Sequence, residues 1–71
     1  MELYQERVVV EKKELDDKLV KLKNFIFRSG GKWLDVPDAE RLRMVKQYGY
    51  MSDYSRILGE RIAAFAEKGT V

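Results

Sequence analysis

The sequence predicts an all-α fold, a two-helix antiparallel hairpin that assembles into a helical homo-oligomer. Two long segments carry apolar residues at helical spacing, two adjacent glycines separate them, and the second segment has more apolar surface than one partner helix covers. The 71 residues form one domain, 1–71, which buries too little surface to be very stable alone. Because cysteine and histidine are absent, disulfides and the usual zinc ligands are excluded, which leaves oligomerisation as the stabilising device.

The first helix is expected at about residues 3–27. Its apolar residues step by seven, four, three and four along one face: Val8, Leu15, Leu19, Leu22 and Ile26. Residues 2–29 contain no glycine or proline, and acidic residues precede basic ones at i,i+4, as in Glu14 with Lys18. Both features favour one uninterrupted helix.

A linker is expected at 28–36. Gly30 and Gly31 accept positive φ and so provide a helix exit. Pro37 suits the first turn of a second helix, and Asp38 and Glu40 place negative charge at its positive end. The second helix is therefore expected at about 37–67, and because it is longer than the first, its far end is expected to project or to meet another protomer.

The second helix carries two apolar stripes. A heptad seam has one polar member and consists of Met44, Tyr48, Met51, Ser55, Leu58, Ile62 and Phe65. A second set consists of Leu42, Val45, Tyr54, Ile57 and Ala64. One partner helix cannot cover both stripes, so self-association is expected. Gly49 and Gly59 lie inside this helix, where glycine is less favourable than alanine. Each glycine indicates either the close approach of another group or a surface position where glycine is tolerated.

Charge and composition limit the classes of function that are possible. The net charge is +2, yet the stretch from Lys18 to Lys46 holds eight basic residues and three acidic ones. This zone favours anionic ligands, or it is a solvated surface. The N-terminus lacks the apolar core of a signal peptide, and no apolar run approaches a membrane span, so a soluble intracellular protein is expected. Without histidine, cysteine or an activated serine motif we expect no enzyme, no cofactor and no metal site.

With catalysis not expected, ligand binding is the function left to consider. Five residues flank the apolar stripe on one side of the first helix: Tyr4, Arg7, Glu11, Lys18 and Lys21. On the second helix, Tyr54, Arg56 and Arg61 offer similar groups from a neighbouring chain. A ring that stacks on a base and cations that hold phosphate oxygens suit a nucleotide. The alternative is that both tyrosines are boundary residues and the arginines form surface pairs.

The chain resembles a known family over about residues 4–65. The first part runs from Tyr4-Gln5-Glu6-Arg7-Val8-Val9-Val10 to Leu19, Leu22 and Phe25-Ile26, and the second comprises Gln47, Met51, Tyr54, Ile57-Leu58 and Arg61-Ile62. These segments resemble the bacteriophage hairpin family of anti-CBASS cyclic-oligonucleotide sponges and related anti-Thoeris sponges. The linker departs from the commonest members, since it carries Trp33, which we expect to plug the end of the hairpin.

The resemblance implies a helical homo-oligomer, commonly a hexamer, that binds cyclic dinucleotides between protomers. Cyclic trinucleotides and cyclic ADP-ribose isomers are further candidate ligands. Such a sponge sequesters the messenger of a bacterial defence system in the host cytoplasm, without cleaving it, so the immune effector stays off. Carried over by resemblance, Tyr4 stacks on a base, Lys18 or Lys21 contacts phosphate, and Arg61 reaches toward a pocket.

Two other hypotheses compete with sequestration. A phage interaction protein would grip a host polypeptide through the apolar stripe of the second helix, and would tolerate substitution of Tyr4 and Lys18. A weak nucleic-acid binder would use the zone from Lys18 to Lys46, with duplex affinity that falls steeply with salt. We do not expect duplex nucleic acid or a membrane as a partner.

Overall fold

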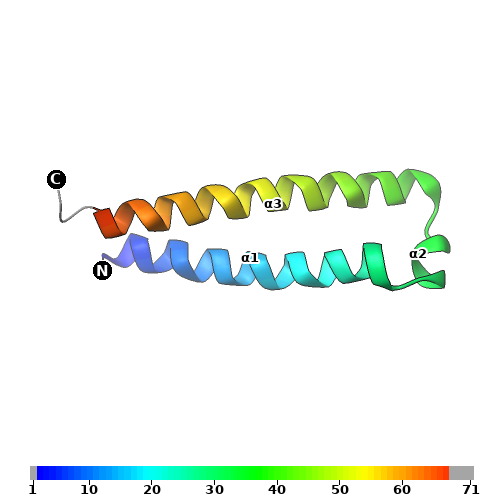
Figure 1. The fold of residues 1–71 in the computed structure, drawn as a ribbon, viewed down its shortest axis with the longest axis horizontal. Helices are drawn as coiled ribbons and strands as arrows, with labels where there is room; N and C mark the ends of the chain where they lie inside the picture. The colour runs from blue at the N-terminus through cyan, green and yellow to red at the C-terminus, as the bar shows by residue number, and fades with distance from the viewer. Residues whose placement is uncertain (1, 68–71) are drawn as a thin grey trace.

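Two long antiparallel helices lie side by side along their whole length in the computed structural model, which describes residues 2–67 (Figure 1). Helix α1 spans Leu3–Arg28, the short helix α2 spans Gly31–Leu34, and α3 spans Asp38–Glu67. The all-helical hairpin is as predicted, with both long helices within one residue of their expected bounds. No helix in this part of the chain is long and apolar enough to cross a bilayer.

Helix α1 begins with a cap that the apolar pattern did not reveal. The backbone N–H of Glu2 donates to Oε1 of Gln5 at 2.8 Å, and Gln5 is buried. This bond satisfies one backbone donor that the helix start leaves without an intrahelical partner. Helix α1 ends where the Ser29 hydroxyl donates to the carbonyl of Phe25 and Gly30 takes a φ of +58°.

The linker expected at 28–36 contains a short helix that the sequence analysis did not anticipate. The backbone N–H of Asp35 donates to the carbonyl of Gly31 at 2.9 Å, which closes the single turn of α2. The second helix was expected from about Pro37, and its observed start lies one residue later. Helix α3 begins at Asp38, and the Pro37 carbonyl accepts from the N–H groups of Glu40 and Arg41.

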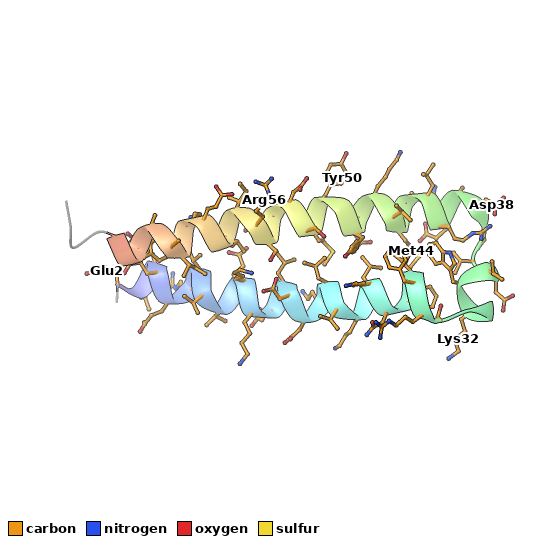
Figure 2. The ribbon with its side chains drawn as sticks, in the orientation of Figure 1. Glu2, Lys32, Asp38, Met44, Tyr50 and Arg56 are labelled. Carbon is orange, nitrogen blue, oxygen red and sulfur yellow. The ribbon has the colours of Figure 1, made fainter. Side chains whose placement is uncertain are left out.

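The core is the seam between α1 and α3. Every member of the predicted heptad seam of α3, and every apolar residue of the predicted α1 face, is buried or half-buried. Leu58 is fully buried, and Val8 and Ile26 pack tightly beside the same seam. Figure 2 shows Met44 directed toward the opposite side of the hairpin and Tyr50 directed outward. The core is narrow, as expected for two helices.

Beside the chain termini, α1 and α3 end level (Figure 1), so the far end of the second helix does not project within the described residues, and its meeting with another protomer stays a prediction. Tyr4 packs edge-on against Phe65, with ring centroids 5.7 Å apart. The extra length of α3 lies at the other end, over α2, where the Arg41 guanidinium sits 5.9 Å from the Trp33 ring centroid. Trp33 also meets Phe25 edge-on at 6.1 Å and closes the end of the hairpin.

Candidate functional site

A groove on one side of the hairpin brings together three of the predicted binding residues, Glu11, Lys18 and Tyr54. It has a volume of about 330 Å³ and is lined by Glu11, Glu14, Leu15, Lys18 and Tyr54. Four of these come from successive turns of α1, because steps of three and four residues return to one helix face. Tyr54 comes from α3 and forms the opposite wall. An aromatic ring and an ammonium group therefore share one concave surface.

The groove is closed on one side by a hydrogen bond between the helices. The Tyr54 hydroxyl donates to a carboxylate oxygen of Glu11. Because the neutral phenol donates to a carboxylate, the pKa of Tyr54 is raised above its usual value, with desolvation adding to the rise and the charge of Arg61 opposing it. The bond holds the tyrosine ring in the same groove as Lys18.

A second part of the predicted site lies at the free end of the hairpin. Tyr4 is half-exposed and keeps its position through the edge-on contact with Phe65. Arg7 lies one turn from Tyr4 on α1, and Arg61 lies about one turn from Phe65 on α3, so both cations are near this end. Both arginines are exposed.

The structure does not gather all the predicted binding residues at one place. Tyr4 and Lys18 are separated by fourteen residues of the same helix, which is about 21 Å at ~1.5 Å per residue. Lys21 is exposed one turn further on and does not line the groove. Of the two lysines that the resemblance offers as the phosphate contact, Lys18 is therefore the one that lines the groove. Tyr4 and Lys18 of one chain lie too far apart to clasp one small ligand.

A polar cluster in the seam escaped sequence reasoning. The Lys12 ammonium donates to Asp16 Oδ2 at 2.7 Å and to Ser55 Oγ at 3.0 Å, and the Ser55 hydroxyl donates to the other Asp16 oxygen. These bonds, first that from Lys12 and then that from Ser55, lower the pKa of Asp16. Ser55, the one polar member of the heptad seam, was the available signal. The cluster joins α1 to α3 across the seam, one residue along each helix from the contact of Tyr54 with Glu11.

The glycines of α3 have different surroundings. A Cβ built on Gly59 would lie 3.3 Å from Cε of Lys12, so this glycine allows the lysine chain to cross the helix. A Cβ on Gly49 would meet nothing within 4 Å. Of the two explanations offered by the sequence, close approach holds for Gly59, and a tolerated open position describes Gly49.

The second apolar stripe of α3 lies outside the seam. Leu42 is 56% exposed, Val45 49% and Ile57 43%. The stripe continues at the bend into a shallow groove of about 340 Å³, lined by Trp33, Asp38, Arg41, Leu42 and Val45. The prediction that one partner helix leaves this stripe uncovered is confirmed.

Comparisons with known proteins place the chain in a family. The family model described as Sequestin matches residues 2–64, which include both long helices except for the last residues of α3. No curated protein and no solved structure matches the chain.

Proposed function

The chain belongs to the Sequestin family, which implies a sequestering protein, and on this premise we propose that it captures cyclic oligonucleotide messengers without cleaving them. In this proposal it is a phage anti-defence protein that acts in the cytoplasm of the infected host. The observation that carries the proposal is the groove in which Tyr54, held by Glu11, lies beside Lys18. A trap that acts stoichiometrically needs ordered recognition groups rather than a catalytic group, and the bond to Glu11 restrains this ring.

The groups along this side of the hairpin match a cyclic dinucleotide. Such a ligand has two phosphate charges and two base faces, so it requires aromatic surfaces and cations in pairs. Tyr54 and Tyr4 offer rings for stacking, while Lys18, Arg7 and Arg61 offer charge for the phosphates. Cyclic trinucleotides and cyclic ADP-ribose isomers present the same two kinds of group and belong to the same ligand class.

The ligand site is completed by a second copy of the chain. Since about 21 Å separates Tyr4 from Lys18 within one hairpin, the two groups can act on one ligand only if they come from different protomers. The exposed stripe of α3, which includes Leu42, Val45 and Ile57, supplies apolar surface for such an assembly. A symmetric pair of copies would present the same ring and cations twice, in keeping with the symmetry of a cyclic dinucleotide. The hexamer implied by the family resemblance would contain several such sites.

Isothermal titration against cyclic di- and trinucleotides and cyclic ADP-ribose isomers tests the proposal. We expect micromolar or tighter binding of at least one ligand by the wild-type chain. Lys18→Ala should weaken it by roughly tenfold or more, since a charged hydrogen bond to phosphate is lost. Lys13→Ala is the matched control, because Lys13 is exposed and lies five residues away, about 140° around the helix. Absence of heat with every ligand would contradict the proposal.

The exposed stripe of α3 favours one alternative function, the binding of a host polypeptide. Ile57→Asp distinguishes the two functions when oligomeric state and nucleotide binding are measured on the same sample. If the stripe serves assembly, this variant sediments as a smaller species and loses nucleotide binding together with the oligomer. If it serves a host polypeptide instead, the variant keeps its oligomeric state, and neither the variant nor the wild type binds the cyclic nucleotides.

A further inference from the structure

Lys12 occupies a position of the inner face of α1 that the apolar pattern skips. This face steps by three and four residues through buried and half-buried positions: Gln5, Val8, Lys12, Leu15, Leu19, Leu22 and Ile26. Gln5 caps the start of the helix, which leaves Lys12 as the polar member inside the seam. Ser55, which is buried, has the same standing in the seam of α3.

The two polar seam positions meet each other. Lys12 Nζ donates to Ser55 Oγ at 3.0 Å and to Asp16 Oδ2 at 2.7 Å, and the Ser55 hydroxyl donates to Asp16 Oδ1. Because a hydroxyl accepts and donates at once, Ser55 joins both charged groups. Both bonds of the cluster that cross from α1 to α3 therefore end on Ser55, and they are directional.

The apolar contacts of the seam fit more than one register. They are non-directional, and a slip of three or four residues brings each apolar seam residue to the place of the next. Such a slip is about 4.5–6 Å at ~1.5 Å per residue. The linker can supply this length, because extending the four residues of α2 from ~1.5 to ~3.3 Å per residue yields about 7 Å.

The polar cluster does not tolerate the same slip. In one direction Ser55 would lie between Leu15 and Leu19, where its hydroxyl has no partner. In the other direction it would move about one helical turn away from Asp16. The bonds on Ser55 therefore favour the observed register over its neighbours, which the apolar residues alone do not.

The same register brings the groove residues together. Glu11 and Tyr54 stand one residue before Lys12 and Ser55, and the Tyr54 hydroxyl donates to Glu11. A slip of 4.5–6 Å would carry the hydroxyl beyond hydrogen-bond reach. It would also change which side chain of α3 faces Lys18 across the groove.

We propose that Lys12 and Ser55 are positioning residues, which together with Asp16 select the register in which Tyr54 meets Glu11. Their part in ligand capture rests on the proposed function, because it assumes that this groove binds the ligand. The register itself can be measured without any ligand.

The test variant combines Lys12→Met with Ser55→Ala, which keeps side chains of similar size in the seam and removes the directional bonds. The register is read from the separation of two nitroxide spin labels by pulsed electron spin resonance. The labels are attached at Glu6→Cys, near the free end, and Lys46→Cys, near the bend, both exposed positions. The chain has no cysteine of its own, so only these two sites react. An excess of unlabelled chain restricts the signal to pairs within one hairpin.

The labelled chain without the seam substitutions should give one separation, and the apolar variant should add a second that differs by roughly 3–6 Å. The melting temperature of the variant should stay within about 5 °C of the wild type. Its affinity for the cyclic nucleotide should fall about two- to threefold when two or three registers share the population.

Two further variants sharpen the comparison. Ser55→Ala alone keeps the pair of Lys12 with Asp16, so it should show the second separation in a smaller fraction of chains. Lys13→Met with Ser52→Ala is the matched control, because it makes the same exchanges at positions outside the seam, and it should change neither separation nor affinity.

One unchanged separation in both seam variants would overturn the inference and assign the register to the ring contacts of Tyr4 with Phe65 and Phe27 with Tyr48. A second separation with unchanged nucleotide affinity would overturn the positioning role in capture. Absence of nucleotide binding by the wild-type chain would instead contradict the proposed function, while the label separations would still test the register.

Discussion

The two glycines of α3 provide a matched pair of substitutions whose effects the structure separates. Both lie in a helix interior, where glycine is less favourable than alanine by about 1 kcal/mol. Gly49→Ala meets nothing within 4 Å, so it should raise the free energy of unfolding by about 1 kcal/mol. For a chain of this length that corresponds to an increase in melting temperature of about 4–8 °C.

Gly59→Ala should give little or none of this gain. Its new Cβ would lie 3.3 Å from Lys12 Cε, below the ~3.5–4.0 Å that carbon atoms prefer. Lys12 cannot simply withdraw, because its ammonium is bound to Asp16 at 2.7 Å and to Ser55 at 3.0 Å. The close contact with Lys12 should therefore offset the gain in helix propensity at position 59. The free energies of unfolding of the two glycine variants should then differ by about 1 kcal/mol.

Thermal unfolding followed by circular dichroism measures both effects, at one protein concentration because an oligomer's melting temperature depends on it. In a Lys12→Ala background, Gly59→Ala should regain the stabilisation seen at Gly49, which a double-mutant cycle makes explicit. Equal stabilisation by Gly49→Ala and Gly59→Ala in the wild-type background would refute the claim that Lys12 is pinned across Gly59.

Three further substitutions or conditions test the packing. Leu58→Ala removes the fully buried side chain of the seam and should lower the free energy of unfolding by about 2–5 kcal/mol, measured by urea titration; a loss below 1 kcal/mol would contradict the seam. Because the pKa of Asp16 is lowered, its bonds with Lys12 and Ser55 contribute stability that is fully present above the unfolded pKa near 3.8 and is lost as pH falls through the lower pKa of the folded state. Between pH 6 and pH 3, the melting temperature of Asp16→Asn should accordingly fall less than that of the wild type. If the melting temperatures of both proteins change in parallel with pH, the claim that this cluster stabilises the fold is refuted. Trp33→Ala should lower the melting temperature by removing the plug at the bend, and an unchanged value would show that α2 adds no stability.

Helical spacing was enough to predict the long helices and the seam. Val8, Leu15 and Leu58 fall on the expected inner faces because the period of 3.6 residues is the dominant constraint in a two-helix fold. The exposed stripe with Leu42 and Ile57 followed from the same pattern. The short helix α2 was missed because a single turn, Gly31–Leu34, is too short to show a period.

The candidate site was less predictable, because its key contacts join residues about forty positions apart. Spacing placed Glu11 and Lys18 on one side of α1, but it could not show that Tyr54 donates to Glu11. The same limit applies to the cluster of Lys12 with Ser55, which depends on the register of the two helices. The register of the two helices depends on all the side-chain contacts across the seam, so a local sequence pattern does not predict it.

Equilibrium dialysis with mass spectrometry tests sequestration most directly. The chain is placed on one side of a membrane with a cyclic dinucleotide it binds, the free ligand is measured, and the protein is then denatured by heat. We expect the free ligand to fall in proportion to the protein added, with the full amount returned intact after heating. No depletion of any cyclic oligonucleotide, or recovery of linear products, would contradict capture without cleavage.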